Sequence, residues 1–262
     1  MTVGNSALLA LRGMLCLATL AAAASLGGRT ARSIRHAARL TRSSRPFHAR
    51  PEAAEASLLI VGDSTALGTG ASAPSASLAG RIAARYPTLR VSNLARAGAR
   101  FADIAEQLRH AGRHDLILVA GGANDVMRFT PHPRLARDIA LTLRRAAAQA
   151  DRVIVVPAPN VGNAPFFPPP LSWLLSHRAR LLHRLARASA STVGAAYVDL
   201  YRDRAADPFA RDPLRLIAAD CLHPSDAGYA VWFEELERQA PLSGLLALRQ
   251  RPPPQAACPG DL

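Results

Sequence analysis

The fold is decided by the stretch Leu58-Leu59-Ile60-Val61-Gly62-Asp63-Ser64, an apolar run that ends in a glycine, an acid and a serine. A short apolar run bounded by a turn signal is typical of a buried strand. A strand that ends in such a turn exposes the serine hydroxyl at the carboxyl edge of a parallel sheet, where α/β folds place their sites. We therefore expect Ser64 to belong to a functional site.

A second informative stretch lies far downstream, at Asp220-Cys221-Leu222-His223-Pro224. A histidine can take the proton of a serine hydroxyl, and a nearby carboxylate can orient the histidine ring. Ser64, His223 and Asp220 together suggest nucleophilic catalysis. Asp199, which follows a strand-like run at 195–198, is an alternative acid.

Two further segments make the pattern specific, Asn93-Leu94-Ala95-Arg96-Ala97-Gly98 and Gly121-Gly122-Ala123-Asn124-Asp125. Serine, glycine, asparagine and histidine now occur in a fixed order. From about residue 57 to about residue 240, the chain resembles the SGNH, or GDSL, hydrolase family, whose four sequence blocks carry these residues.

The resemblance implies a role for each block. Ser64 would be the nucleophile and His223 the base that Asp220 holds. The oxyanion hole would be formed by Ser64, Gly98 and Asn124. These residue types suit acyl transfer, because each fixed donor aimed at the developing oxyanion is typically worth a factor of about 100 to 1,000 in rate.

A different serine hydrolase fold also needs to be considered. The segment from Gly62 to Ala66 nearly matches the nucleophile elbow of α/β-hydrolases, with Ala66 where the second glycine would be. In that fold the serine follows several strands and the acid lies far from the histidine in sequence. Here Ser64 ends the first strand and Asp220 precedes His223 by three residues, so the order argues against the elbow.

The pattern between the blocks predicts a three-layer α/β/α sandwich around a five-stranded parallel sheet, a flavodoxin-like arrangement. Apolar runs predict strands at 57–61, 89–94, 116–120, 153–157 and 195–200. Longer amphipathic stretches predict helices at 75–86, 100–111, 133–149, 171–190 and 225–239.

A proline-rich insertion at 157–170 follows the fourth predicted strand and should overhang the same sheet edge as Ser64. Phe166, Phe167 and the nearby Trp173 are predicted to form an apolar wall for the substrate or a partial lid. Alternatively, the prolines brace a long crossing and the aromatic side chains pack on the sheet.

The first fifty residues differ in composition from the rest of the chain. Residues 7–26 are almost wholly apolar apart from Arg12, and the first fifty residues hold eight arginines and no acid. We expect an apolar membrane-anchor or signal segment at 1–28 and an Arg-rich linker at 29–54. The hydrolase domain would then span 55–240, followed by a proline-containing flexible tail at 241–262.

Three explanations of the apolar segment remain open. A membrane anchor needs about 20 apolar residues, and arginines after it would keep the enzyme domain on the cytoplasmic face of the membrane. A cleaved signal peptide would instead give a secreted or periplasmic protein. An Arg-rich leader without acids also resembles a mitochondrial transit peptide.

The sequence argues against other partners. The formal net charge is +13, yet the excess positive charge lies chiefly in a terminal arm where few aromatic residues interleave with the arginines, so we expect no nucleic-acid binding. The three cysteines have no zinc-ligand spacing, and we expect neither a metal nor a cofactor.

The sequence therefore predicts a membrane-associated serine esterase that cleaves carboxylic esters through an acyl-serine intermediate. The substrate would be a lipid ester, a thioester or an acetylated sugar. The alternatives are an acyltransferase, a carbohydrate deacetylase on the same site, and a catalytically silent, membrane-tethered binding protein.

Overall fold

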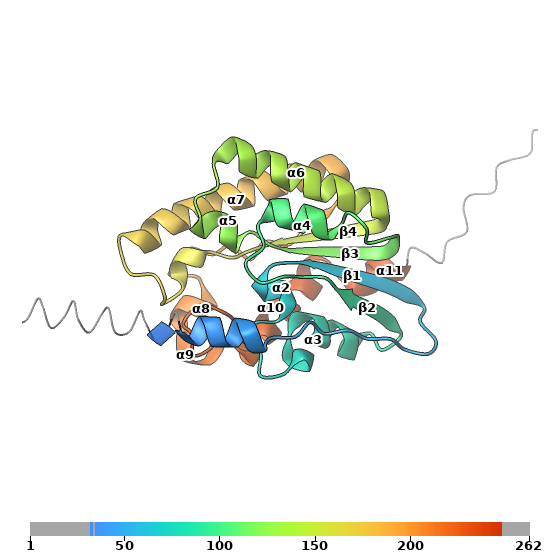
Figure 1. The fold of residues 1–262 in the computed structure, drawn as a ribbon, viewed down its shortest axis with the longest axis horizontal. Helices are drawn as coiled ribbons and strands as arrows, with labels where there is room; N and C mark the ends of the chain where they lie inside the picture. Colours follow the sequence, from blue (N-terminus) through green and yellow to red (C-terminus); the bar gives the residue numbers. More distant parts are fainter. Residues whose placement is uncertain (1–31, 34, 248–262) are drawn as a thin grey trace, which may run out of the picture.

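A parallel sheet forms the centre of the computed structural model, which describes residues 32–33 and 35–247. Its five strands are all parallel and lie in the order β2-β1-β3-β4-β5. They span Ala56–Gly62 (β1), Leu89–Asn93 (β2), His114–Gly121 (β3), Ala150–Pro157 (β4) and Ala196–Tyr197 (β5). Helices cover both faces of the sheet (Figure 1). The predicted α/β/α sandwich is confirmed.

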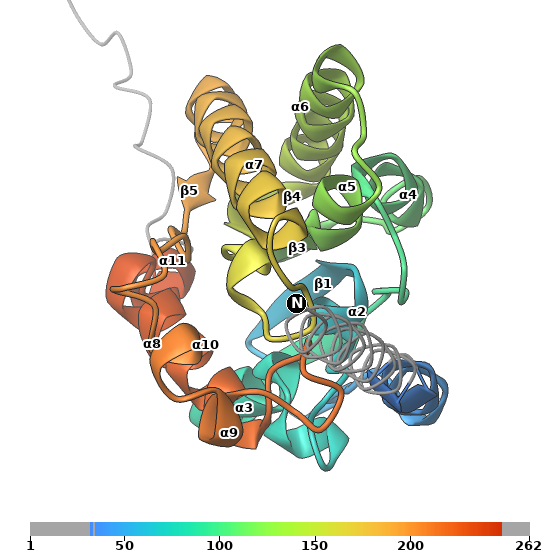
Figure 2. The ribbon, with the colours of Figure 1, turned by 90° about the vertical axis from the view of Figure 1, so that its left-hand side faces the viewer.

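The two helical layers are unequal. One layer contains α4 (Phe101–Gln107), α5 (Ala123–Met127), α6 (His132–Gln149) and α7 (Leu171–Val193). The other contains α2 (Ser64–Leu67), α3 (Leu78–Arg85), α8 (Pro208–Arg211), α9 (Pro213–Leu216), α10 (Asp226–Gln239) and α11 (Leu242–Ala247), as Figure 2 shows from one end of the sheet. Short 3₁₀ turns occur at Pro74–Ala76 (η1) and Val161–Asn163 (η2).

Strand β1 contributes to the cores on both faces of the sheet. Leu59 and Val61 pack in the core under α4 to α7, whereas Leu58 and Ile60 pack in the core under α3 and α10. Successive side chains of a strand point to opposite faces, so a strand buried on both faces needs an unbroken apolar run. This requirement explains why the first strand is so clear in the sequence.

The carboxyl end of β1 is held by a close strand contact and by a buried glutamine. A side chain at Gly62 would place its Cβ 1.9 Å from the carbonyl oxygen of Ala120 on β3, so only glycine fits there. Gln107 accepts a hydrogen bond from the Gly62 N–H at 2.8 Å and donates one to the Gly62 carbonyl at 2.9 Å. The residue before the Asp63-Ser64 turn is thus fixed from both sides.

The expected Arg-rich linker is more structured than its composition indicated. Residues 35–43 are helical. Ala49 then exchanges two backbone hydrogen bonds with Val91 of β2, at 3.0 and 2.9 Å, and Phe47 packs against the core. This segment covers the outer edge of β2, and covering an edge strand protects its unpaired backbone groups from other chains.

The expected tail also differs at its start, because residues 242–247 form helix α11 with the side chain of Leu242 fully buried. The remainder of that predicted tail, 248–262, and the predicted apolar segment at 1–28 lie outside the described residues. None of the helices in the described ranges combines the length and the apolar character needed to cross a membrane.

Replacing Gln107 by leucine should lower the free energy of unfolding by about 1–3 kcal/mol. Arg96 also donates to the Gly62 carbonyl, so the group left without a partner is the buried Gly62 N–H, and an unsatisfied buried donor costs about this much. Chemical denaturation measures the change. Gln149→Leu, at the half-buried end of α6, is the control and should stay within about 0.5 kcal/mol. Equal effects of both variants would contradict the assigned role of Gln107.

Candidate active site

Ser64 is the first residue of α2 and follows β1 after a single residue, Asp63. The Asp63 carboxylate caps this helix, because its Oδ1 accepts hydrogen bonds from the backbone N–H and the hydroxyl of Thr65, at 3.0 and 2.8 Å. Burial raises the pKa of Asp63 above its ordinary value, against the effect of these hydrogen bonds. Asp63 therefore shapes the turn that presents Ser64.

The histidine comes from a loop that is closed by backbone hydrogen bonds. Ala218 donates to the carbonyl of His223 at 2.8 Å, and Ser225 donates to the carbonyl of Leu216 at 2.9 Å. Between them, Cys221 adopts a left-handed conformation with φ of 64°, which tightens the turn. The loop thus brings the imidazole to the edge of the sheet just before α10 begins.

The three residues expected to cooperate lie in one chain of contacts. The Nε2 atom of His223 is 2.9 Å from the Oγ of Ser64, although 159 residues separate them in sequence. The other ring nitrogen, Nδ1, is 2.5 Å from Oδ2 of Asp220. Asp220 is fully buried, and its Oδ1 accepts from the N–H groups of Leu222 and His223, each at 3.0 Å.

These contacts determine where the protons lie. Burial alone would raise the pKa of Asp220, but the hydrogen bond and charge of His223 and the two backbone N–H groups outweigh burial and hold that pKa below 3.8. Asp220 is therefore ionised at neutral pH. A carboxylate at Nδ1 fixes the proton of the neutral imidazole on that nitrogen, which leaves the lone pair of Nε2 directed at the Ser64 hydroxyl.

Three polar groups at the same edge of the sheet as Ser64 have a hydrogen that they do not donate to any acceptor in the described part of the protein. The backbone N–H groups of Ser64 and Gly98 have no acceptor in the described part of the chain. The side-chain amide of Asn124 donates one hydrogen to the carbonyl of Ala99 at 3.1 Å, which leaves its second hydrogen free. These are the three donors expected from the sequence.

The glycine segment is attached to the end of β1. The Arg96 N–H donates to the carbonyl of Gly62 at 3.1 Å, and Ala99 donates to the carbonyl of Arg96 at 3.2 Å. Gly98 lies inside this turn with φ of 80°, a conformation that favours glycine. The same strand end therefore positions both Ser64 and Gly98.

Asp125 has a structural role. Its Oδ2 accepts from the Phe101 N–H at 2.9 Å and its Oδ1 accepts from the Thr130 hydroxyl at 2.8 Å, while burial raises its pKa. These bonds join the start of α4 to the segment after α5. The side chain of Asp125 thereby supports the short helix α5, which carries Asn124.

Asp199, the alternative acid, belongs to a different cluster. Its carboxylate lies 2.7 Å from the guanidinium of Arg187 and 3.3 Å from Nδ1 of His183. The hydrogen bond from His183 lowers the pKa of Asp199, although its partial burial opposes this. His223 is instead paired with Asp220, so the structure favours Asp220 as the orienting acid.

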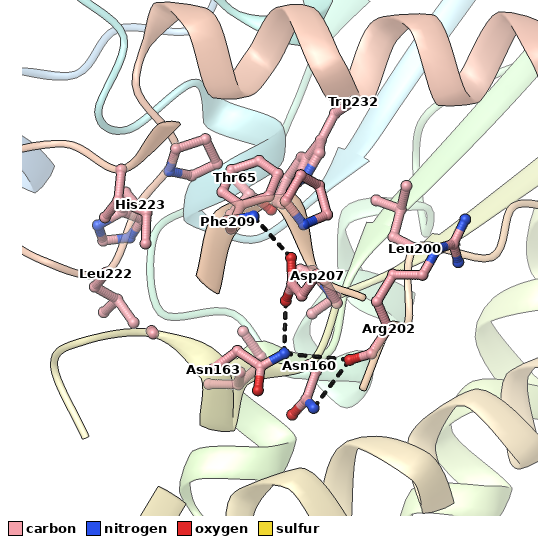
Figure 3. A pocket seen from close by; sticks show the side chains of 18 of the residues that line it. Thr65, Asn160, Asn163, Leu200, Arg202, Asp207, Phe209, Leu222, His223 and Trp232 are labelled. Carbon is pink, nitrogen blue, oxygen red and sulfur yellow. Dashed lines mark hydrogen bonds between the residues drawn. The ribbon is translucent and has the colours of Figure 1, made fainter. Parts of the chain in front are cut away.

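A cavity of about 300 Å³ opens beside Ser64 and His223. In Figure 3 its wall runs from His223 and Leu222 to Leu200 and Arg202. Most of the wall is apolar and includes Leu200, Phe209, Ile217, Leu222, Val231 and Trp232. Besides Ser64, Thr65 and His223, its polar part consists of Asn160, Asn163, Arg202, Asp207 and Glu235.

Two asparagine side chains of the cavity are hydrogen-bonded to the loop after β5. Asn163 donates to Oδ2 of Asp207 at 2.6 Å and to the carbonyl of Arg202 at 3.2 Å, and Asn160 donates to the same carbonyl at 3.1 Å. Burial raises the pKa of Asp207. This network fixes the loop after β4 against the loop after β5.

The prediction that Phe166, Phe167 and Trp173 form the apolar wall is wrong in part. The loop after β4 does line the cavity, but through the segment 158–164 and not through Phe166, Phe167 or Trp173. Phe167 packs against the hydrophobic core and contacts Phe166 edge to face, whereas Trp173 is 70% exposed on the first turn of α7. The prolines carry the chain past the opening before the aromatic residues occur.

The sequence did not reveal the residues that form the apolar wall. Phe209 lies on α8 and Trp232 on α10, with ring centroids 5.9 Å apart. Each comes from an element that contributes only two or three of the lining residues, so no local motif marks them. Pro208 after Asp207, a helix-start signal, was the available indication that this loop is ordered.

A metal-binding arrangement is not apparent in the described ranges, where no three histidine, cysteine, aspartate or glutamate side chains are grouped so that they could hold an ion.

Replacing Asp220 by asparagine should reduce stability in a pH-dependent way. The pKa of Asp220 is lowered by folding, so the stability that its carboxylate contributes is present above pH 3.8 and is lost as the pH falls through the lower pKa of the folded state. We expect a deficit of about 1.5–3 kcal/mol at neutral pH, typical of a hydrogen bond to a charged group. The deficit should narrow below pH 3.8.

Urea unfolding of both proteins between pH 7 and pH 3 measures this difference. Asp212→Asn removes an exposed carboxylate that is paired with Arg215, and a surface pair is worth only about 0–1 kcal/mol. A deficit that stayed the same at all pH values would show that the charge of Asp220 is unimportant for folding.

Comparisons with known proteins agree with this geometry. A sequence model of the GDSL-like Lipase/Acylhydrolase family matches residues 60–231, while no curated protein is significantly similar to the chain. Among solved structures, LAE5, an alpha/beta hydrolase enzyme from the metagenome of Lake Arreo in Spain, is 22% identical with a TM-score of 0.57, over 74% of this chain and 97% of LAE5.

Two other solved structures have the same fold. The lipase/acylhydrolase from Enterococcus faecalis is 20% identical with a TM-score of 0.54, over 72% of this chain and 96% of its own. Axe2, an acetylxylan esterase from Geobacillus stearothermophilus, is 18% identical with a TM-score of 0.51, over 71% of this chain and 94% of Axe2. The resemblance noted in the sequence is thus confirmed: the chain belongs to the GDSL-like lipase/acylhydrolase family of hydrolases.

Proposed function

We propose that this protein hydrolyses carboxylic esters through an acyl-enzyme intermediate on Ser64. The observation that carries the proposal is the continuous chain of contacts from Asp220 through His223 to Ser64, at 2.5 and 2.9 Å. A hydroxyl aligned with a neutral imidazole whose other nitrogen is held by an ionised carboxylate is equipped for nucleophilic attack.

The first half of the reaction transfers the acyl group to the enzyme. Nε2 of His223 takes the proton of the Ser64 hydroxyl as Oγ bonds to the ester carbonyl carbon, which gives a tetrahedral intermediate and an imidazolium. The imidazolium then gives this proton to the leaving alcohol oxygen as the carbon–oxygen bond breaks. Asp220 stays ionised throughout and stabilises the charged ring.

The second half releases the acid. His223 takes a proton from a water molecule that attacks the acyl carbon, and it returns that proton to Ser64 as the acyl–serine bond breaks. An alcohol in place of water would make the protein an acyltransferase by the same steps. The products formed with and without an added alcohol distinguish these two outcomes.

The unused donors of Ser64, Gly98 and Asn124 support a role as the oxyanion hole. During attack the carbonyl oxygen becomes negatively charged, and donors that are already in place cost no reorganisation. The two backbone N–H groups and the free hydrogen of the Asn124 amide need an acceptor, and the oxyanion would supply it.

The cavity supports acyl groups longer than acetyl. One water-sized unit occupies about 30 Å³, so a cavity of about 300 Å³ has room for on the order of ten non-hydrogen atoms, whereas an acetyl group has three. Its wall includes Phe209 and Trp232, which suit a hydrocarbon chain. We therefore favour a lipid ester or a long-chain thioester over an acetylated sugar.

Replacing Ser64 by alanine should abolish ester hydrolysis while the protein remains folded, because the attacking atom is removed. The assay uses aryl esters from acetate to octanoate, and the parent should prefer chains longer than acetyl. A fluorophosphonate should label the parent and Ser75→Ala, a control at an exposed serine of η1, but not Ser64→Ala. Substantial turnover by a well-folded Ser64→Ala variant would eliminate the acyl-serine mechanism.

Replacing Asn124 by alanine should lower kcat by on the order of 100-fold or more with little change in KM, because an oxyanion donor acts mainly in the transition state. Steady-state kinetics on the preferred aryl ester measure the effect. The melting temperature is recorded in parallel, since Asn124 also bonds to Ala99. A raised KM with unchanged kcat would mean that Asn124 binds substrate instead.

A further inference from the structure

Large exposed apolar side chains gather at one end of the molecule. Among the described side chains there are six, with exposed fractions that reach 70% for Trp173 and 97% for Leu214. The six are Leu94, Phe129, Leu171, Trp173, Leu174 and Leu214. Each lies on a segment that follows the carboxyl end of a strand or that leads to the loop of His223, so they lie on the side of the sheet that carries the proposed active site.

The positions follow from the elements that carry these side chains. Leu94 comes directly after β2, and Phe129 follows α5. The first turn of α7 carries Leu171, Trp173 and Leu174, while α9 carries Leu214. Figure 1 shows the start of α7 and helix α9 at the same end of the molecule, and Figure 2 views that end directly.

Part of this surface is continuous. The guanidinium of Arg178 lies 6.0 Å from the centre of the Phe129 ring and also bonds to the carbonyl of Thr130. Leu174 is one helical turn before Arg178 on α7, so the two side chains share a face of the helix. Phe129, Leu174 and the stem of Arg178 therefore form one apolar strip.

Exposed arginines accompany the apolar side chains. Four of them have no ion pair within the described part of the chain: Arg96, Arg128, Arg204 and Arg211. Arg96 is two residues from Leu94, Arg128 precedes Phe129, and Arg211 is three residues before Leu214. Arg204 and Trp173 line the same surface hollow.

The N-terminal part of the chain brings more positive charge to this end. Arg32, Arg35, Arg39 and Arg42 are exposed at spacings of three and four residues, which place them on one face of a helix. That helix begins at the end of the molecule where α7 also begins (Figure 1). The chain before it contains the apolar stretch at 7–26.

We propose that this end of the domain, defined by the six exposed apolar side chains and the four unpaired arginines, docks on an anionic lipid surface. Tryptophan and leucine insert at the boundary between headgroups and acyl chains, and arginine extends its charge to lipid phosphates while its stem stays in apolar surroundings. A bilayer is broad enough to contact side chains from five separate segments at once. Docking in this orientation would bring the cavity beside Ser64 to the membrane surface.

Tryptophan fluorescence can report this docking without any ester cleavage. The chain has two tryptophans: Trp173 is 70% exposed, whereas Trp232 is 8% exposed. The full-length protein is mixed with phosphatidylcholine vesicles that contain phosphatidylglycerol, with or without bromine on the acyl chains. The parent emission should shift to the blue and be quenched by brominated lipid, while Trp173→Phe should show neither change.

A second comparison tests whether the position of the arginines matters, by using two triple variants that have the same net charge. The rim triple Arg96→Gln, Arg204→Gln and Arg211→Gln removes three exposed arginines around the opening. The control triple Arg90→Gln, Arg144→Gln and Arg152→Gln removes three exposed arginines at the amino-terminal side of β2, at the end of α6 and at the start of β4. Each arginine near an anionic surface adds about fivefold to partitioning, so the rim triple should bind roughly 100-fold more weakly and the control within about threefold.

Several results would overturn the proposal. Vesicle binding without any change at Trp173 would mean that another part of the chain makes the contact. Equal losses in the two triples would leave only a non-specific effect of net charge. A blue shift that depends on protein concentration and not on vesicles would indicate self-association of this face. Hydrolysis of a soluble aryl ester separates a failure of docking from a failure of the proposed reaction. The rim triple should retain this activity, because the change at Arg96 keeps the backbone N–H that donates to Gly62.

Discussion

The geometry of the site depends on one buried carboxylate. Asp220 is fully removed from water, and an ionised acid in that position needs a hydrogen-bond partner for each oxygen. Two backbone N–H groups of its own loop serve Oδ1, and the imidazole of His223 serves Oδ2. The need to satisfy Asp220 therefore fixes the path of the loop, the orientation of the ring and the nitrogen that carries the proton. Nε2 of the ring is then left to face the Ser64 hydroxyl.

The parallel sheet is what allows residues from four distant segments to meet. Parallel strands end at the same edge, so the turns after β1, β2 and β3 deliver Ser64, Gly98 and Asn124 to one place. The Gly62 carbonyl accepts hydrogen bonds from Arg96 and Gln107. These bonds fix the glycine turn and helix α4 to the residue before the Asp63-Ser64 turn. A shift of β1 relative to its neighbours would disturb all of these groups together.

The sequence predicted those parts of the structure that local physics determines. Strands buried on both faces need unbroken apolar runs, so the sheet could be inferred. The turns at the strand ends need glycine and capping acids, so the positions of Ser64, Asn124 and His223 could be inferred as well. The cavity could not, because elements far apart in the sequence contribute Phe209 and Trp232 one at a time. Phe166, Phe167 and Trp173 were placed wrongly because composition shows that a loop is apolar without showing which way its side chains point.

The same topology that assembles the site also concentrates exposed side chains around it. The turns at the carboxyl edge must be long enough to present polar groups, and long turns cannot bury all of their apolar residues. A solvent-exposed tryptophan and leucine beside the opening cost free energy in water, about 25 cal/mol per Å² of apolar surface. An apolar phase placed against this edge of the sheet would remove that free-energy cost for all of the exposed apolar side chains. In water the cost remains. Under the proposed docking, the exposed apolar side chains and the apolar cavity would both face lipid.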